Sequence, residues 1–555
     1  MLRTLVKNQI IENILRPQNF DSKLGHKKFS ILILDKSAME IVNSCLSLNE
    51  VFEEGVTLVE DLTKCREPMP SMEAIYVMAA VPDSIDILIR DFTRQSKHFP
   101  ENSYKFGHVF FLDVCNDELF NKLAKSSAVN YLKTLKEINL SFKPVESQIF
   151  TVNSQDEGNL RRTADGIASF CAASKINPTL RFHTNNAQSA EICYQVDQTL
   201  KDIQSDLTTQ AELVVIDRSF DLISPLLHEC TLQAMASDLT DFHNGIYRYK
   251  GDEDETKEIP LDENDPVWLE VRHKHLADVL KSVPKLTKEL QQIRGSSSTN
   301  KSAKEVQTTI RQLPAYLKKK SKAEAYLNLA EECREKYFGS LDKIILFEQD
   351  MAIEHTPEGN ELNDSQTVNR LSTFMSPEIP IDTRLRLILI FLLTIGKEKD
   401  EQFFNRFIRH TDIPDDEFKV IQKMLNWRDR SRSSPFHRRR PPPEDERYPS
   451  SRWDPKLRNL IQDIQQKRLD ERGFKFLGQK TISENRAATS ARYGGGLIGR
   501  PKERRKIIVF VIGGITYSEI RTVYEMSEQT NTTIILGSNT VLTPSQFLMS
   551  LRSAC

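Results

Sequence analysis

Residues 212–239 of this chain are ELVVIDRSFDLISPLLHECTLQAMASDL, and they carry its strongest structural signal. The apolar run near their start is β-prone and ends in the charged pair Asp217-Arg218, so it predicts a buried strand of a parallel sheet. A turn that contains proline follows, and then a helix-like segment that holds His228 and Glu229. Asp217 lies where the strand becomes a loop, which is where open α/β sheets usually bind ligands.

Strand-like runs alternate with helix-like segments through the first 140 residues. Amphipathic segments such as 83–92 and 117–126 separate short apolar runs. This alternation predicts a parallel sheet with helices on both faces. The strand-like runs are residues 29–35, 55–61, 74–81 and 108–113, and a second α/β unit follows with runs at 147–152 and 212–217.

Strand-like runs of similar quality return only near the end of the chain, at residues 507–514 and 532–538. The two strands and two short helices expected there are too few to bury a core alone, so they must join a sheet formed earlier. Residues after about 240 are therefore expected to form an insertion. Thr543-Pro544 predicts the N-cap and the first position of the closing helix.

The insertion has a helical pattern. Two apolar stripes repeat at helical spacing, and Pro314 interrupts the pattern between them. This predicts a helical hairpin at about 267–350 with a proline near its tip. The arginine- and proline-rich residues 428–450 predict a flexible linker. The stripes are Trp268, Val271, His275 and Val279, and Tyr326, Ala330, Cys333, Tyr337, Leu341 and Ile344.

The expected fold class is therefore α/β, with parallel sheets flanked by helices and a large, mainly α-helical insertion. A chain of 555 residues is too long for one core and favours about three domains. The expected boundaries are 1–139 for domain 1, 140–240 and 471–555 for the two parts of domain 2, and 241–470 for domain 3.

Composition narrows the class of partner. A net charge of −2 creates no overall field that would attract nucleic acid or an anionic membrane. The eight scattered cysteines are typical of a reduced, cytoplasmic protein. The N-terminus has no secretory signal pattern, and the longest apolar stretch, residues 385–395, is too short to cross a membrane and favours a buried core helix. We expect membrane contact only through a partner.

No catalytic constellation can be assembled from the residues. The aspartates that end strands indicate either a phosphoryl or metal site or ordinary helix caps and turns. His273 and His275 lack further metal ligands at suitable spacing. Arginines in 428–440 indicate either a phosphate-binding segment or a solvated loop. No enzymatic activity, cofactor or metal is expected. The strand-end aspartates are Asp35, Asp61, Asp113 and Asp217.

Several segments resemble the SM family, the Sec/Munc-eighteen proteins that bind syntaxin and other SNAREs. Residues 217–239 match the family's DRxxDxxSPLLHExTxQAM pattern, with Ser219 where glycine is usual. The other segments resemble the plasma-membrane branch of the family and extend the similarity from end to end. They are residues 54–77, 451–464, TSARYG at 489–494 and 509–521.

The resemblance implies a three-domain arch without enzymatic activity. Such a protein acts as a chaperone that clasps syntaxin in its closed form, binds the N-terminal peptide of syntaxin, and guides assembly with a synaptobrevin-like vesicle SNARE. It implies a monomer in the cytoplasm that syntaxin recruits to the plasma membrane for exocytosis. Two alternatives remain: an SM protein of an endosomal or Golgi pathway, and an α/β enzyme that binds nucleotide or metal through the strand-end aspartates.

The resemblance also assigns site residues. Ser47 stands where relatives carry lysine and Glu40 where arginine is common, so the charge that faces syntaxin differs here. For the peptide-pocket residues, ordinary helix packing is the alternative interpretation. The implied residues are Asp35, Met39, Glu60, Lys64 and Glu67 for closed syntaxin, Phe120, Leu132 and Glu137 for the N-terminal peptide, and Pro314 and Leu327 for the vesicle SNARE.

Overall fold

The computed structural model divides into two compact units. Unit 1 comprises residues 1–218, 466–515 and 523–540, and unit 2 comprises residues 219–465, 516–522 and 541–555. The three domain boundaries given above remain a proposal. The structure describes residues 1–21, 26–93, 102–152, 160–203, 207–251, 255–282, 321–398, 413–414, 417–432, 448–478 and 505–553.

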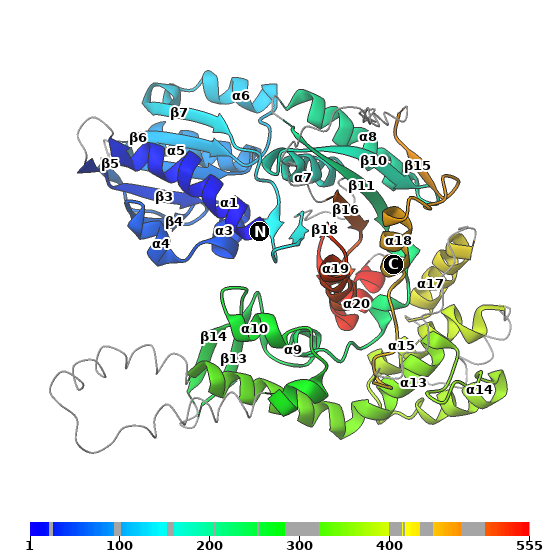
Figure 1. Ribbon diagram of the computed structural model, residues 1–555. Coiled ribbons are helices and arrows are strands. Elements are labelled where there is room, and N and C mark those ends of the chain that lie inside the picture. The colour runs from blue at the N-terminus through cyan, green and yellow to red at the C-terminus, as the bar shows by residue number, and fades with distance from the viewer. Residues whose placement is uncertain are drawn as a thin grey trace, which may run out of the picture. The chain divides into compact units, whose positions relative to one another are not determined.

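The first sheet of unit 1 has five parallel strands in the order β4-β3-β5-β6-β7 (Figure 1). The four strands predicted from apolar runs are present, and a fifth at the edge had no such signal. The bounds are Ser30–Leu34 for β3, Val56–Asp61 for β4, Met69–Met78 for β5, Tyr104–Phe111 for β6 and Leu132–Glu137 for β7.

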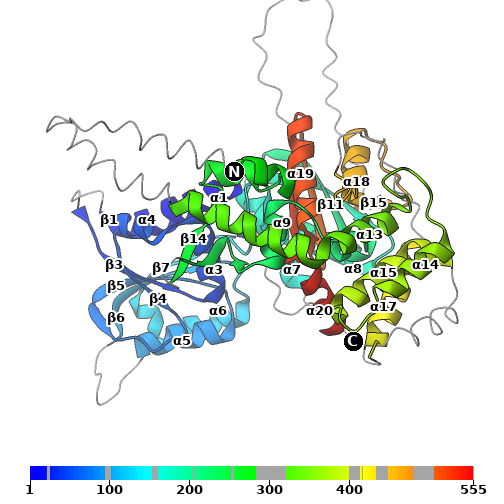
Figure 2. The same ribbon diagram turned by 90° about the horizontal axis from the view of Figure 1, so that it is seen from below.

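Alternate side chains of β3 enter different cores. Leu32 and Leu34 belong to a cluster with helices α1 and α3, whereas Ile31 and Ile33 belong to one with α5 and α6. Figure 2 shows α1 and α4 on one side of this sheet and α5 and α6 on the other. The predicted helix-covered sheet is therefore confirmed. The helices are α1 Leu2–Ile10, α3 Lys36–Cys45, α4 Leu48–Glu53, α5 Pro82–Thr93 and α6 Asp117–Ala124.

The second sheet of unit 1 is completed by the end of the chain. Its order is β15-β10-β11-β16-β18-β9-β8, and β16 pairs in parallel with β11 and with β18 (Figure 1). The prediction that the late strands join an earlier sheet is confirmed. The bounds are Lys143–Pro144 for β8, Ile149–Thr151 for β9, Ile176–His183 for β10, Thr209–Asp217 for β11, Phe474–Phe476 for β15, Arg505–Ile512 for β16 and Thr532–Ser538 for β18. The helices α7, α8 and α19 span Leu160–Ala173, Ala187–Asp202 and Tyr517–Gln529.

Unit 2 is mainly helical, as expected. Residues 385–392 of α15 are all buried, so the apolar stretch is a core helix. Residues 321–353 form one helical run with a π-helical turn at Tyr337–Leu341, and the predicted stripe faces its core. The helices are α9 Leu232–Leu239, α10 Pro266–Val271, α13 Asp342–Ile353, α14 Asp364–Thr373, α15 Ile381–Leu393, α17 Glu417–Arg432, α18 Lys456–Gln465 and α20 Pro544–Ser553. A small antiparallel sheet contains β12 Phe242–His243, β13 Ile246–Lys250 and β14 Thr256–Pro260.

Two sequence predictions in unit 2 are wrong. The stripe at 268–279 is not one helix, because α10 ends at Val271 and His275 forms a β-bridge with Thr231. His228 and Glu229 lie in an extended loop rather than a helix, since the backbone N–H of His228 donates to a side chain of α13. In both places, contacts with distant segments replace local helical hydrogen bonds.

Some predictions concern residues outside the described ranges. Pro314, the TSARYG segment at 489–494 and most of the proposed linker at 428–450 lie there. The start of that linker is corrected, because α17 continues to Arg432. In the part of the chain that the structure covers, no helix combines the length and apolar character needed to cross a bilayer.

Gly537 provides a test of the packing in the second sheet. A Cβ at this position would lie 2.3 Å from the ring of Phe150 and 2.8 Å from that of Phe510. Gly537→Ala should lower the free energy of unfolding by about 2 kcal/mol, because overpacking forces these rings to move. Denaturant unfolding measures the change. Gly339→Ala is the control, since nothing lies within 4 Å of that position; equal stability of both variants would contradict the packing.

Candidate functional site

The end of β11 is fastened inside unit 1. The side chain of Arg218 donates from Nη1 to the carbonyl of Gly514, 3.1 Å away, which joins β11 to the turn after β16. Asp217 lies 3.8 Å from His183 of β10. Gly513 and Gly514 form a tight turn, with φ of 91° and 106°. These contacts give the Asp217-Arg218 pair a structural role.

Asp221 brings two of the family-like segments together. Its side chain is fully buried and accepts hydrogen bonds from the Ser224 backbone and hydroxyl and from the backbone N–H of Lys456 at 2.9 Å. The Ser224 hydroxyl in turn accepts a hydrogen bond from the indole of Trp453 at 2.9 Å. Segments 217–239 and 451–464 therefore meet in unit 2 through one buried aspartate.

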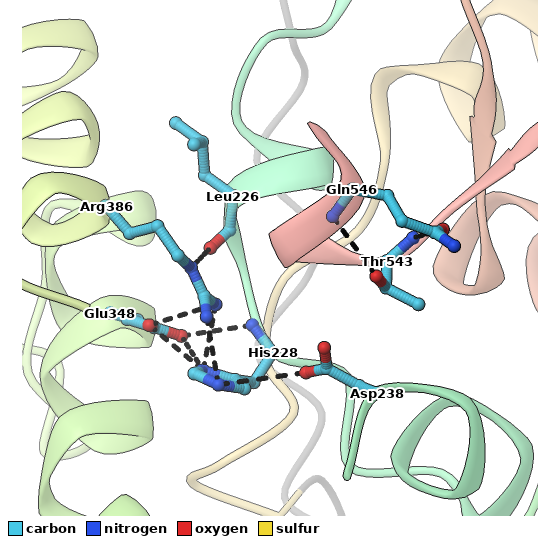
Figure 3. Close-up of polar contacts among 7 residues, drawn as sticks. All are labelled: Leu226, His228, Asp238, Glu348, Arg386, Thr543 and Gln546. Carbon is cyan, nitrogen blue, oxygen red and sulfur yellow. Dashed lines mark hydrogen bonds and ion pairs between the residues drawn. The ribbon is translucent and has the colours of Figure 1, made fainter. Parts of the chain in front are cut away.

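A buried clamp of His228, Glu348 and Arg386 holds the same loop (Figure 3). The carboxylate of Glu348 lies 2.9 Å from Nδ1 of His228 and accepts from the His228 backbone N–H at 3.0 Å. Arg386 donates from Nε to the carbonyl of Leu226 at 2.9 Å, and its Nη2 lies 3.3 Å from Glu348. One helix supplies the anion and another the cation, α13 and α15 respectively.

Electrostatics explains why an ionised carboxylate is stable in this core. Burial alone would raise the pKa of Glu348, but His228, Arg386 and the hydrogen bonds hold that pKa below its usual value. Beside the clamp, Glu229 pairs with Arg521 at 3.1 Å.

Thr543 and Gln546 cap α20 reciprocally, which confirms the predicted start of that helix (Figure 3). The loop is thus fixed by ionic and polar contacts on several sides.

A small cavity lies beside this loop. Its volume is about 20 Å³, and its lining includes Ser224, Glu229 and Thr543. A cavity of that size has room for a single water molecule and not for a nucleotide. The contacts of the clamp therefore serve the packing of unit 2.

The strand-end aspartates of the first sheet accept backbone hydrogen bonds, at a helix cap for Asp35, in a turn for Asp61 and from a distant loop for Asp113. Asp35 accepts from the backbone N–H of Ala38 at the start of α3 and from that of Ala79, and burial raises its pKa. Asp113 accepts from Ala80, and burial raises its pKa as well. Hydrogen bonds from Thr63 lower the pKa of Asp61. The hydrogen bonds of each carboxyl group thus give it a structural role that involves neither phosphoryl transfer nor metal binding.

Metal coordination finds no support among the residues that the structure describes, because none of them form a group of three or more His, Cys, Asp or Glu side chains suited to a metal ion. His273 and His275 are both half-buried. Burial lowers the pKa of His275 to about 4, and His275 stacks on Tyr448 with ring centroids 3.9 Å apart.

The residues assigned to closed syntaxin differ in accessibility. Lys64 and Glu67 are exposed on the loop between β4 and β5, whereas Asp35 is 8% exposed. Met39 packs partly against the cluster that contains Leu32, Leu34 and residues of α1 and α3. Glu60 accepts a hydrogen bond from Tyr104 at 3.0 Å. The loop residues are therefore the accessible part of this set, and the roles of all five stay predictions.

Ser47, one of the departures from the family, has a local role. Its hydroxyl and backbone form a capping box with Glu50 at the start of α4. A serine here gains a helix cap where a lysine would supply positive charge. The family pattern alone did not indicate that Ser47 caps α4.

The residues assigned to the syntaxin N-terminal peptide lie on or next to an exposed apolar area. Phe120 of α6 is 47% exposed, so ordinary core packing does not account for it. Leu132 packs partly against the cluster that contains Ile31, Ile33 and residues of α5 and α6. Glu137 accepts a hydrogen bond from the backbone N–H of Cys115 at 2.9 Å. Other exposed apolar side chains come from the same part of the chain, namely Val114, Val129, Tyr131 and Leu135.

The hairpin prediction is covered by the structure at one of its two residues. Leu327 lies in the helical run 321–336 and packs partly against the core of unit 2, whereas Pro314 is outside the described residues. The clamp partners Glu348 and Arg386 were not singled out from the sequence. The signal for Arg386 was present, because a charge inside a buried apolar run needs a partner.

The clamp predicts a large loss of stability when its cation is removed. Arg386→Met leaves Glu348 buried without this cation, so the free energy of unfolding should fall by about 3–5 kcal/mol. The double variant Glu348→Gln with Arg386→Met should lose less than Arg386→Met alone, as both charges are then absent. Denaturant titration measures both, with Lys201→Ala of an exposed ion pair as the control. A larger loss in the double variant would disprove the coupling.

The environment of His273 predicts acid sensitivity. Burial, with the charges of Arg272 and Arg521, lowers the pKa of His273 to about 3, whereas an unfolded histidine has a pKa of about 6.5. Between these values the unfolded state binds a proton that the folded state does not, so stability falls by about 1.4 kcal/mol per pH unit as the pH drops. Unfolding at pH 7, 6 and 5 measures the slope. His273→Asn should make it shallower, and an unchanged slope would contradict this assignment.

Comparison with known proteins identifies the family. A Sec1 family model matches residues 30–550 of this chain. The "Protein transport protein sec1" of Dictyostelium discoideum is 27% identical, over 99% of this chain and 98% of the relative.

Solved structures share the fold. The Unc18–syntaxin 1 complex from Monosiga brevicollis contains a chain of 24% identity and TM-score 0.83, with 99% of each chain covered. The SM protein Vps45 in complex with the Qa SNARE Tlg2 contains one of 20% identity and TM-score 0.82, with 99% of this chain and 98% of that chain covered. Because the family match spans most of the sequence, this protein belongs to the Sec1 family of SM proteins.

Proposed function

We propose that this protein binds a syntaxin-type SNARE and guides SNARE-complex assembly in vesicle docking and fusion. Family membership carries the proposal, and the two solved relatives named above were each captured with such a SNARE. The residue arrangement agrees with it, because Lys64, Glu67 and Phe120, which the family pattern assigns, are exposed on unit 1. Recognition of a helical bundle needs surface rather than an enclosed pocket.

The proposal includes three binding surfaces. The loop that carries Lys64 and Glu67 contacts closed syntaxin, and the area around Phe120 binds the N-terminal peptide. The exposed aromatic ring of Phe120 suits a bulky side chain of a short peptide, and the carboxylate of Glu137 suits a basic one. A third surface on the hairpin, with Leu327, binds the vesicle SNARE. A monomer recruited from the cytoplasm by its syntaxin, with no other membrane contact, completes the proposal.

The pathway we propose is exocytosis at the plasma membrane, on the strength of segments 54–77 and 451–464 and the name of the Dictyostelium relative. The alternative is an endosomal or Golgi pathway, which the fold match to Vps45 keeps open. Affinity measurements against a panel of syntaxins decide between them. Binding of nucleotide or divalent metal at micromolar concentration in calorimetry would instead favour the enzyme alternative.

A decisive experiment compares the complete cytoplasmic region of the cognate syntaxin with the same region lacking its N-terminal peptide. Phe120→Ala should weaken binding of the complete region by about 2 kcal/mol, the typical effect of removing an anchor residue. It should leave binding of the truncated region unchanged. Lys64→Ala with Glu67→Ala should instead weaken binding of both regions. Calorimetry or biolayer interferometry provides the dissociation constants.

The matched control is Tyr194→Ala on α8, because that side chain is 51% exposed but is not part of either proposed surface. Its affinities should equal those of the unmodified chain. Equal weakening of both syntaxin regions by Phe120→Ala would contradict the assignment of Phe120 to the peptide surface.

A further inference from the structure

A buried arginine lies inside the loop that carries two of the proposed syntaxin contacts. The loop comprises residues 62–68 and joins β4 to β5. Lys64 and Glu67 are exposed, but the side chain of Arg66 between them is 8% exposed and donates to Asp91 of α5 at 2.9 Å. The sequence KCRE at 64–67 thus places one inward cation between two outward charges.

The loop is fastened at its ends by the backbone and at its middle by this arginine. The N–H of Leu62 donates to Leu34 at 2.8 Å, and the N–H of Met69 donates to Ser103 at 2.7 Å. Among the described residues, Arg66 is the one side chain of 64–68 that hydrogen-bonds to the rest of unit 1. Together with the backbone N–H of Lys64, which donates to the carbonyl of Asp61 at 3.3 Å, this side-chain contact fixes the position of the exposed charges.

The acceptor of this contact is itself held in place. Asp91 accepts a second hydrogen bond from the buried hydroxyl of Tyr76 at 2.8 Å, and its backbone carbonyl accepts from the N–H of Ser103 at 2.9 Å. Ser103 also receives the end of the loop through Met69. Asp91 thus links α5 to β5 through Tyr76, and to the end of the loop through Ser103.

The ion pair is poorly suited to stabilising the fold as a whole. Buried ion pairs roughly break even between attraction and lost hydration, and Nε and Nη1 of Arg66 are buried without a hydrogen-bond partner among the described residues. Its clearer effect is geometric, because the hydrogen bond from Nη2 to Asp91 holds the buried Arg66 side chain, and with it the middle of the loop, against α5.

We propose that Arg66, held by Asp91, is a positioning residue that presents Lys64 and Glu67 to the partner SNARE in a fixed geometry. This inference rests on the proposed function. It adds that affinity for syntaxin depends on two side chains that are themselves too buried to touch it. Preorganised loops bind more tightly because less ordering remains to be done on association.

The test measures the dissociation constant of the full chain for the syntaxin cytoplasmic region. Asp91→Asn keeps the shape of the side chain and an oxygen for Tyr76 but removes the charge that holds Arg66. Arg66→Met removes the contact from the loop side. Each variant should bind about tenfold more weakly than the unmodified chain, equivalent to about 1.4 kcal/mol. Arg161→Met, which removes an exposed arginine on α7, is the control and should bind normally.

A double-mutant cycle separates positioning from general stability. When Lys64→Ala and Glu67→Ala are already present, adding Asp91→Asn should change the dissociation constant by less than about twofold, because interacting residues are non-additive. A tenfold loss in that background, or normal binding by both Asp91→Asn and Arg66→Met, would overturn the inference and leave the proposed function intact. If the unmodified chain binds no syntaxin, the proposed function itself fails. Thermal unfolding confirms that each variant is folded at the assay temperature, and a loss of affinity explained by unfolding counts against the inference.

Discussion

The ion pair between Glu348 and Arg386, closed by His228, is the constraint on which unit 2 depends. It joins two helices to residues 227–230, which belong to no helix or strand. An isolated charge at either position would be expensive to bury, so the three groups are stable only together. Asp221 and Trp453 add a second polar junction to the same loop. The family-like sequence 217–239 is therefore a structural signature: its polar residues hold the helical unit together.

The two units use polar residues for different purposes. In unit 2 the buried charges unite segments that are more than 100 residues apart along the chain, as with His228 and Glu348. In unit 1 the aspartates at the ends of strands accept backbone hydrogen bonds: Asp35 caps α3, Asp61 closes a turn, and Asp113 holds the loop before α5. Both uses leave the exposed charges on the β4–β5 loop free for a partner. The buried polar groups therefore stabilise the fold, whereas the exposed charges are available to recognise a partner.

Much of the fold could be predicted because apolar runs mark parallel strands directly. Strands β7 and β10 were missed, since β7 reads LKTLKE at an exposed edge and Pro178 interrupts β10. The loop at His228 was mistaken for a helix because its partner, Glu348, is 120 residues away. The local sequence pattern around His228 contains no information about so distant a contact. The candidate site depended on family resemblance, which named exposed residues such as Lys64. The buried residue beside it, Arg66, became visible only through its contact with Asp91.

The order of strands in the second sheet has a consequence for biosynthesis. β9 is made early, yet its parallel neighbour β18 lies about 380 residues later, by the difference between Thr151 and Thr532. At a translation rate of about 5–20 residues per second, β9 waits roughly 20–80 s for that neighbour. During this interval the nascent sheet has open edges on β9 and β11, which are templates for wrong pairing. Folding of this protein on the ribosome thus requires protection of those edges until the last strands emerge.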